Sequence, residues 1–273
     1  MRSLVLWFLP AFIMCLSAPA MAQVEKGTYK YDGPMVNGKK SGNGTCIWPN
    51  GDKYVGDFLN DTMNGQGIMY YADSNRYEGA WKNGMQNGKG TFFWKSGDRY
   101  EGDFVNDHMH GKGVCYWTND ERYEGDYVND DRTGEGTYYW PNGDKYVGLF
   151  NKNMRDGHGV YYYENGARYE GPWVKDKKNG NGQFYWGNGD KYDGHFENDM
   201  RNGFGNYFII SRKAKNTIKY CPRAKKYVGQ WQDGLKHGRG SVYNKKNKLI
   251  FQGRFEEDKP KGRYPSKKPK TKK

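Results

Sequence analysis

Large, small and polar side chains recur along this chain with a period of 23 residues. Glycine follows two residues after each repeated tyrosine, and a large residue, usually aromatic, follows two residues later, as in Tyr100-Glu101-Gly102-Asp103-Phe104. Successive residues of a β-strand face opposite sides, so Tyr100, Gly102 and Phe104 are expected to share one face of a strand. The repeated tyrosines are Tyr31, Tyr54, Tyr77, Tyr100, Tyr123, Tyr146, Tyr169 and Tyr192.

A second strand is predicted before each tyrosine strand. The run from Gly90 to Trp94 is rich in aromatic and β-branched residues, which favours a strand. A turn such as Pro49-Asn50-Gly51-Asp52 then leads to the tyrosine strand, because Asn-Gly accepts positive φ. Each repeat is therefore predicted to be a β-hairpin, and a glycine-rich connection such as Gly88-Lys89-Gly90 is expected between hairpins.

Glycine inside a strand weakens β structure, so its recurrence needs a reason. A glycine between two large residues leaves room for a neighbouring ring to lie across the backbone. Stacked hairpins would then form a continuous ladder of aromatic rings, each contributing about 2–3 kcal/mol when buried. The composition agrees with such a ladder, because 24 Tyr, 13 Phe and 9 Trp make up nearly half of a hydrophobic fraction of only 35%.

Charged residues flank each repeated tyrosine. The preceding residue is basic, and the following residue is often acidic, as in Arg99-Tyr100-Glu101. Both charges are expected on the face opposite the tyrosine ring, where cross-strand ion pairs on a solvated surface would contribute about 0.2–1 kcal/mol each. A regular row of binding residues is the alternative. The basic members are Lys53, Arg76, Arg99, Arg122, Lys145, Arg168 and Lys191.

The string Tyr-x-Gly-x-(Trp/Phe)-x-x-Gly-x-x-x-Gly-x-Gly, intact from Tyr77 to Gly90, resembles the MORN repeat (membrane occupation and recognition nexus). The resemblance covers about residues 31–264. It implies an all-β fold, an elongated twisted antiparallel sheet of successive hairpins that is open rather than closed. It also implies a scaffold or recognition surface rather than a catalyst, since such arrays are associated with membranes, phosphoinositides, protein partners and dimerisation.

The repeat departs from this pattern in three places. The glycine seven residues after the tyrosine is replaced by Asp or Asn in most units, as at Asp107, and these residues are expected to keep the left-handed turn. Tyr192 and Tyr227 are 35 residues apart, which indicates an insertion of 12 residues. The last unit begins with Phe251 and is expected to act as a cap that stops strand addition.

Residues 1–22 are typical of an export signal. Arg2 is followed by an uncharged apolar run, and Ala20-Met21-Ala22 supplies the small residues of a cleavage site. We expect an exported protein, periplasmic or secreted, with a repeat array over 23–264. The alternative is an uncleaved segment that anchors the chain in a membrane.

Two segments carry the basic charge. The net charge of +13 is concentrated in the insertion at 206–226 and in the tail, of which 265–273 is expected to be disordered. The tail either solubilises the chain or attaches it to an anionic membrane, where each basic residue is worth about 1 kcal/mol. The candidate anion-binding residues are Arg212, Lys213, Lys215, Lys219, Arg223, Lys225, Lys226, Lys267, Lys268, Lys270, Lys272 and Lys273.

Three cysteines follow the export segment. Cys46 and Cys115 have the same place three repeats apart, so about 29 Å is expected between them, too far for a disulfide. We therefore predict no intramolecular disulfide. Cys221, within the insertion, is the candidate for an intermolecular bond.

No catalytic or cofactor-binding motif is present in the sequence. His108 and His110 lack a completing cluster of carboxylates or cysteines, so no metal site is expected. The Gly-x-Gly pairs precede strands rather than helices and so do not indicate a dinucleotide site. We predict a non-catalytic scaffold that binds a protein partner or itself, with a homodimer as one form. The alternative is a peripheral membrane protein, and neither nucleic acid nor a small-molecule substrate is expected.

Overall fold

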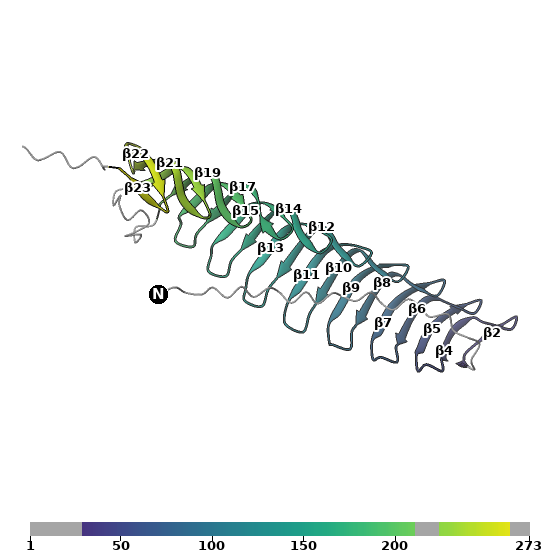
Figure 1. Ribbon diagram of the computed structural model, residues 1–273. Helices are drawn as coiled ribbons and strands as arrows, with labels where there is room; N and C mark the ends of the chain where they lie inside the picture. The colour runs from purple at the N-terminus through teal and green to yellow at the C-terminus, as the bar shows by residue number, and fades with distance from the viewer. Residues whose placement is uncertain (1–28, 211–223, 263–273) are drawn as a thin grey trace, which may run out of the picture. The chain divides into compact units, whose positions relative to one another are not determined.

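The computed structural model describes residues 29–210 and 224–262, which contain β-strands and turns. They form two units, each described by itself: residues 29–95, 101–111 and 128–130 in the first, and 96–100, 112–127, 131–210 and 224–262 in the second. Within each unit neighbouring strands follow the order of the chain (Figure 1). The described part is therefore all-β, as predicted.

The first unit is an antiparallel sheet in which each strand pairs with the next. Its strands are β1 (Lys30–Asp32), β4 (Gly42–Ile47), β5 (Lys53–Leu59), β6 (Thr62–Tyr70), β7 (Arg76–Lys82) and β8 (Met85–Phe93), with a small hairpin of β2 (Met35–Val36) and β3 (Lys39–Lys40). Three strands belong in part to each unit: β9 (Arg99–Val105), β10 (His108–Tyr116) and β11 (Arg122–Val128).

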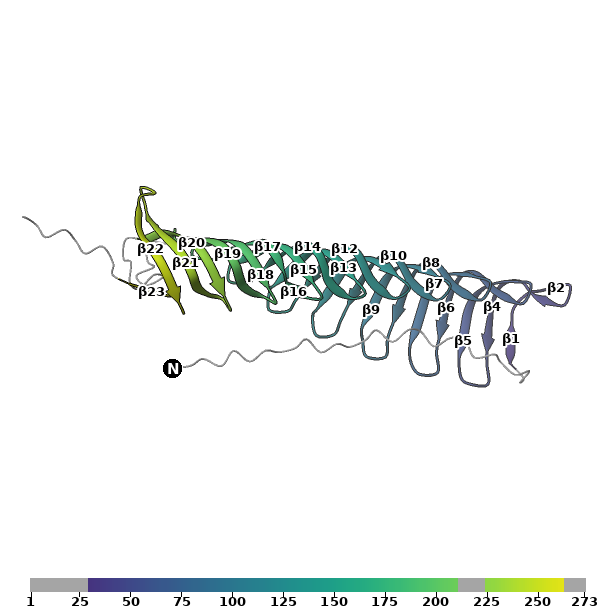
Figure 2. The ribbon, with the colours of Figure 1, turned by 45° about the horizontal axis from the view of Figure 1, so that its top comes forward.

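The second unit repeats this antiparallel arrangement, and its last strands are seen most clearly in Figure 2. Its strands are β12 (Asp131–Tyr139), β13 (Lys145–Asn151), β14 (Met154–Tyr162), β15 (Arg168–Val174), β16 (Lys177–Lys178), β17 (Gly180–Tyr185), β18 (Lys191–Glu197), β19 (Met200–Phe208), β20 (Ala224–Gln232), β21 (Leu235–Asn244), β22 (Leu249–Glu256) and β23 (Lys259–Lys261). In the described residues β23 pairs only with β22, so the sheet stays open.

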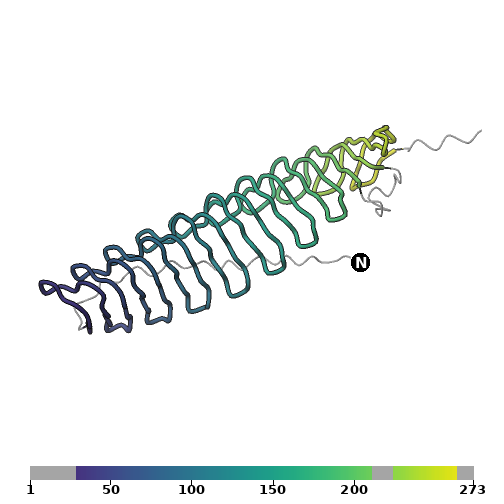
Figure 3. The backbone as a smooth tube through the Cα atoms, turned by 180° about the vertical axis from the view of Figure 1, so that it is seen from behind, coloured from purple at the N-terminus to yellow at the C-terminus, as the bar shows by residue number. Residues whose placement is uncertain are grey.

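The Gly-x-Gly pairs lie inside strands, which corrects the expected glycine-rich connection. Gly88 and Gly90 belong to β8, where Gly90 pairs with Gly79 of β7. Gly88 has a φ of +103° and lies at a register shift between Gly79 and Trp81, as in a β-bulge. Both connections of a repeat are therefore short turns, which alternate along each unit in Figure 3.

The paired glycines make room for the tyrosine of their own repeat. A Cβ added to Gly90 would lie 2.3 Å from the Tyr77 hydroxyl, and one added to Gly79 would lie 2.5 Å from the Gly90 Cα. The Tyr77 hydroxyl donates a hydrogen bond to the Ala80 carbonyl at 3.0 Å. The expectation of a ring across the backbone is thus confirmed, and the ring belongs to the same strand as the first glycine.

The aromatic ladder runs through both units. Tyr77 lies edge-to-face against Trp81 of its own strand at 5.2 Å, and against Phe104 of the next repeat at 5.0 Å. The same contacts recur in the second unit, as for Tyr146 with Phe150 and Trp173. Repeated tyrosines such as Tyr77 and Tyr146 are completely buried. Met35 is the exception at the ladder position, because it is 55% exposed.

The turn seven residues after the tyrosine is a two-residue turn with both φ values positive, 49° at Asn106 and 69° at Asp107. The expectation that Asp keeps this turn is confirmed. Asp107 also accepts a hydrogen bond from the backbone N–H of Gln86 in the preceding repeat, at 2.8 Å. At the other turn one residue has positive φ, which is glycine in most repeats, as for Gly51 at 96°, and Ser74 or Asp120 in others, at 75° and 65°. A repeat with Asp or Asn at this position thus caps a backbone amide of the repeat before it.

Proline interrupts two of the long strands. Asn179 donates its N–H to the Pro172 carbonyl at 3.1 Å, and the long strand is split there into β16 and β17. Ser41 makes the same bond to Pro34, where β3 and β4 are separate. Both breaks therefore lie opposite a proline, which has no N–H to donate to a strand partner.

Candidate binding face

One face of the second unit carries partly exposed rings beside the buried ladder. Trp117, Trp140 and Trp186, each near the turn that precedes a repeated tyrosine, are half-buried. They alternate with rings of the adjacent strands, and Tyr138 lies 5.6 Å from Trp117 and 4.6 Å from Trp140. This face, which also bears the repeated tyrosines, is called the ladder face below.

A row of cations lies on the ladder face of the second unit, one in each repeat, nine residues after the repeated tyrosine. The Arg155 guanidinium carbon lies 4.3 Å from the Trp173 ring centroid and within 5.8 Å of three further rings. Aromatic faces attract cations, so the rings hold the charge in place. The cation row consists of Arg132, Arg155, Lys178, Arg201 and Lys236.

An aspartate of the following repeat neutralises three members of the cation row. Asp176 lies 2.9 Å from the Arg155 Nε, and Asp258 lies 3.2 Å from the Lys236 Nζ. Lys178 and Asp199 form the third pair at 3.9 Å. Each carboxylate stands in the two-residue turn and also accepts the backbone N–H of its partner cation. The same aspartate side chain thus caps the backbone of the preceding repeat and neutralises its cation.

Arg132 and Arg201 lack this carboxylate. Asn153 stands beside Arg132 and accepts its Nε–H through Oδ1 at 3.3 Å. Gly234 stands beside Arg201, whose Nη2 donates to the Gly234 carbonyl at 2.5 Å. Among the described residues no carboxylate forms an ion pair with either guanidinium. The cation row therefore has two positive charges, at Arg132 and Arg201, that no ion pair among the described residues neutralises.

Burial lowers the pKa of two members of the cation row, Arg201 and Lys236. It lowers the pKa of Arg201, and the charge of Asp258 opposes that shift. Burial also lowers the pKa of Lys236, and Asp258 again acts in the opposite direction by charge and by hydrogen bonding. The charge of one carboxylate, Asp258, therefore acts on two neighbouring cations at the end of the cation row, although it forms an ion pair only with Lys236.

The first unit has neutral residues at the same repeat position, except in its first repeat. Met63, Gln86 and Met109 stand where the second unit has Arg or Lys, and each is at least 95% buried. Gln86 donates its side-chain amide to the Tyr71 hydroxyl at 3.0 Å. Lys40 is the one basic residue, and its Nζ lies 4.0 Å from the Tyr29 ring centroid. The ladder faces of the two units therefore differ in charge.

The opposite face, called the outer face, carries the basic residues that precede the tyrosines. The Arg76 guanidinium lies over the Phe93 ring of the paired strand at 4.2 Å and forms an ion pair with Glu78 of its own strand at 3.2 Å. Arg122 and Arg168 repeat this arrangement. The expected ion pairs thus run along a strand, and the cross-strand contact is between a cation and a ring.

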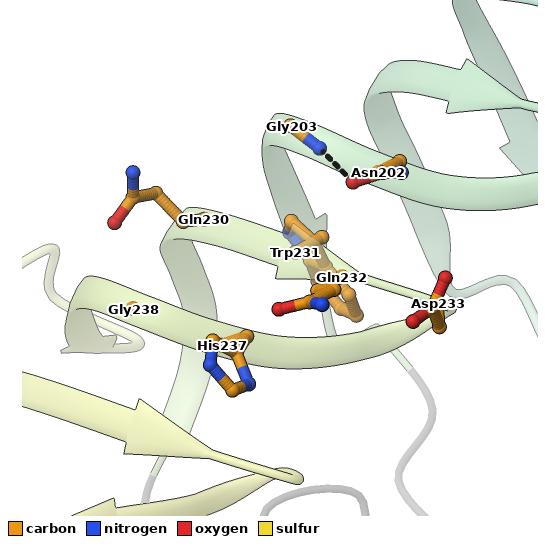
Figure 4. Close-up of a pocket in the computed structure, with 8 residues that line it drawn as sticks. All are labelled: Asn202, Gly203, Gln230, Trp231, Gln232, Asp233, His237 and Gly238. Carbon is orange, nitrogen blue, oxygen red and sulfur yellow. Dashed lines mark hydrogen bonds between the residues drawn. The ribbon is translucent and has the colours of Figure 1, made fainter.

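An open pocket of about 310 Å³ lies near the end of the second unit (Figure 4). It is lined by Asn202, Gly203, Gln230, Trp231, Gln232, Asp233, His237 and Gly238. Trp231 also contacts Arg201, with its ring centroid 4.4 Å from the guanidinium carbon. The lining offers amides, a carboxylate and an imidazole, and it contains no nucleophile paired with a base.

The structure places few of the candidate anion-binding residues. Lys225 and Lys226 belong to β20 rather than to a loop, and the Lys226 Nζ lies 5.3 Å from the Phe208 ring centroid. Lys226 is thus a member of the basic row on the outer face. The other candidates lie outside the described residues, together with Cys221: Arg212, Lys213, Lys215, Lys219, Arg223, Lys267, Lys268, Lys270, Lys272 and Lys273.

The cysteines inside the sheet are inaccessible. Cys46 and Cys115 are both completely buried, and Cys46 is a free thiol. Burial raises the pKa of Cys46, although Lys40 opposes the shift. Cys46 is therefore a packing residue rather than a nucleophile.

The cation row could have been found from the sequence. Its members keep a constant distance of nine residues from the repeated tyrosines, but their side chains differ from repeat to repeat. The change from neutral to basic residues between Met109 and Arg132 was the available signal. Residues 29–210 and 224–262 contain no cluster of three or more potential metal ligands and no helix that could cross a membrane.

The solved structures that a comparison finds similar to this chain share little sequence with it. The TCP domain of Drosophila melanogaster SAS-4, in complex with a proline-rich motif of Ana2, is 14% identical with a TM-score of 0.39, over 66% of this chain and 99% of that domain. The TCP10 domain of Danio rerio CPAP, in complex with a STIL peptide, is 11% identical with a TM-score of 0.29, over 83% of this chain and all of that domain. These similarities are too low to bear on function.

Curated protein sequences give no match to this chain. The family model of the MORN repeat matches nine segments, which agree with the 23-residue period: 31–53, 54–76, 77–99, 100–122, 123–145, 146–168, 169–191, 192–208 and 227–243. The insertion falls between the last two segments. With most of its length matched, and with the tyrosine–glycine ladder in both units, the chain belongs to the MORN repeat family.

Proposed function

We propose that this protein is a non-catalytic, exported scaffold that binds an acidic segment of a protein partner through the ladder face of its second unit. The cation row carries this proposal. Five cations lie on one face, two of them in no ion pair with a carboxylate of the described residues, and half-buried indoles lie beside them. Aromatic rings and arginine are the residues that most often dominate the energy of protein interfaces.

The experiment compares the two faces of the second unit at equal net charge. The triple variant Arg132→Gln, Arg155→Gln, Lys178→Gln removes three charges from the ladder face, and Gln86 shows that glutamine fits this repeat position. The control is Lys145→Gln, Arg168→Gln, Lys191→Gln, which removes three charges from the outer face. Binding of a fluorescein-labelled oligoglutamate peptide is measured by anisotropy on the full mature chain.

We expect the ladder-face variant to lose at least ten-fold in affinity, since each charge-assisted hydrogen bond is worth about 1.5–3 kcal/mol. The outer-face control should lose less than three-fold. Equal losses would mean that binding is a general effect of net charge, and unaltered binding in both would reject the ladder face as the site.

Attachment to an anionic membrane is the second candidate function, and the charge of the sequence favours it. The tail from Lys259 to Lys273 contains eight basic and no acidic residues. Flotation with phosphatidylserine vesicles, with and without residues 259–273, tests it. Loss of flotation is expected on truncation, which removes the basic residues, and at high salt, which screens surface charges. Flotation that is unchanged by truncation and by salt would reject membrane attachment through the tail.

Export itself is part of the proposal and rests on residues 1–22, which lie outside the described residues. Mass spectrometry of the chain from its native host would show an N-terminus at Gln23 if the signal is cleaved there. An intact N-terminus in a membrane fraction would favour the anchored alternative. Self-association also remains a proposal, and sedimentation of the purified chain measures it.

A further inference from the structure

We propose that Arg201 is a receptor for a carboxylate group of the bound partner, which takes the place that an aspartate of the next repeat takes elsewhere in the cation row. This inference rests on the proposed function and names the residue at which an acidic side chain binds. Three observations lead to it: the repeat rule, the exception at Gly234, and the surroundings of the guanidinium.

The repeat rule is that the fold supplies its own counter-ion. Arg155, Lys178 and Lys236 each have an aspartate in the two-residue turn of the following repeat. The turn positions have φ values of 68° at Asp176, 71° at Asp199 and 66° at Asp258. A carboxylate at this place is therefore the chemistry that the fold itself uses to satisfy these cations.

Gly234 is one of two exceptions, the other being Asn153 beside Arg132, which keeps a side-chain acceptor. Gly234 has a φ of +80°, which is close to the values of the aspartates, so the turn is retained while the carboxylate is lost. A Cβ built on Gly234 meets nothing within 4 Å. Space for a carboxylate therefore exists beside Arg201, and among the described residues only the backbone carbonyl of Gly234 accepts from its Nη2.

The surroundings of Arg201 make the missing charge costly. The guanidinium is held by the rings of Trp186, Tyr192 and Trp231, at 4.4 Å for Trp231. Arg201 is half-buried, so part of its hydration is lost. Lys236 is a second cation nearby, and it already has Asp258 as its partner. A ligand carboxylate would restore the balance of one carboxylate for each cation, and an arginine can donate two parallel hydrogen bonds to its oxygens.

A carboxylate added by mutation should compete with that of the ligand. Gly234→Asp restores the repeat rule beside Arg201. The matched control is Gly84→Asp, since Gly84 has the same repeat position and a φ of +82° but stands beside the neutral Met63. Both variants add one negative charge at the same kind of turn, so net charge and turn chemistry are controlled together.

The oligoglutamate peptide is the probe, with oligoglutamine as its neutral counterpart, and binding is measured by anisotropy on the full mature chain. We expect Gly234→Asp to weaken oligoglutamate binding about ten-fold, the loss of one charge-assisted contact, and to raise the melting temperature by a few degrees. Gly84→Asp should change affinity less than two-fold.

A second variant keeps the proposal falsifiable if the added aspartate perturbs the fold. Arg201→Gln should weaken binding to the same extent, and Gly234→Asp should have no further effect in that background. Equal losses in Gly84→Asp and Gly234→Asp would overturn the role of Arg201. So would a rise in melting temperature without a loss of affinity.

The outcome also separates this inference from the proposed function. If the ladder-face triple variant loses affinity while Gly234→Asp does not, the ladder face binds the partner but Arg201 is not its carboxylate receptor. If wild-type protein does not distinguish oligoglutamate from oligoglutamine, both fail together. Weaker binding by phosphatidylserine vesicles in Gly234→Asp, with oligoglutamate unaffected, would assign the site to lipid and overturn the proposal.

Discussion

The two units share one architecture and differ in what they place on it. Tyr77 and Tyr146 have the same ring contacts, the same glycine pairs and the same burial. Nine residues after these tyrosines stand Gln86 in the first unit and Arg155 in the second. The ladder and turns are therefore requirements of the fold, whereas this position varies without changing the backbone. A position that the fold leaves open is where a repeat protein can acquire a specific function.

The strongest test of what the units share is alkaline pH. Burial raises the pKa of the repeated tyrosines in both units above the ordinary value of 10, as for Tyr54, Tyr77, Tyr146 and Tyr192. A raised folded-state pKa means that the stabilisation is complete below about pH 10 and is lost as pH rises further, by up to about 1.4 kcal/mol per pH unit for each tyrosine.

We therefore expect cooperative unfolding shortly above pH 10, with tyrosine ionisation and loss of the β-sheet circular dichroism at the same pH. The two units should respond alike. Ionisation at pH 10 with the sheet intact would contradict the burial of these rings.

The paired glycines allow the same glycine-to-alanine substitution to be tested in each unit. Gly90→Ala and Gly159→Ala both place a Cβ 2.3 Å from a tyrosine hydroxyl, that of Tyr77 or of Tyr146. Each should reduce the free energy of unfolding by about 3 kcal/mol, because the ring cannot remain across the backbone. Urea denaturation measures this. A loss in one unit only would show that the ladders are not equivalent.

The turn aspartates should distinguish the units. Asp107 accepts one backbone N–H, that of Gln86, whereas Asp176 accepts the Arg155 N–H and pairs with its guanidinium. Asp107→Ala should cost about 1 kcal/mol and Asp176→Ala about 2 kcal/mol, since the second change also leaves a half-buried charge unpaired. Double-mutant cycles with Gln86→Ala and Arg155→Ala would isolate the interaction energy between the two side chains of each pair. This energy should be measurable only for Asp176 and Arg155 of the second unit.

The smallest effect is expected from giving the first unit a cation. Gln86→Arg introduces an arginine beside Asp107, as in the pair of Arg155 and Asp176, and should change the free energy of unfolding by less than about 1 kcal/mol. Met63→Arg faces Gly84 and lacks a carboxylate, so it should cost about 1–2 kcal/mol. Thermal unfolding of both variants checks the order, and the reverse order would show that the turn carboxylate is not the counter-ion.

The sequence predicted the ladder because its residues are restricted in type. Only glycine leaves space for the Tyr77 ring, and only large side chains reach from one repeat to the next, so both positions recur visibly. The length of the strands was harder to predict, because Gly88-Lys89-Gly90 was interpreted as a connection although a β-bulge accommodates it within β8.

The binding face could be predicted less well for a physical reason. The position of Arg155 tolerates methionine, glutamine, lysine and arginine, since the surrounding rings accept both an apolar chain and a cation. Its function depends on the Asp176 carboxylate 21 residues later, a relation that becomes visible only when adjacent repeats are seen side by side. The absence of that carboxylate at Gly234 is a signal of the same kind.

The hydrogen bonds between the turn aspartates and the preceding repeats all run in one direction, so the two ends of the array are not equivalent. Because the aspartate of one repeat satisfies an amide of the repeat before it, removal of a repeat from the N-terminal side leaves only a carboxylate that water can solvate. Removal from the C-terminal side leaves an N–H without its acceptor, which is the more costly loss. Truncations from the two ends of the array are therefore not equivalent, because only the loss of a later repeat removes the acceptor of an amide that remains.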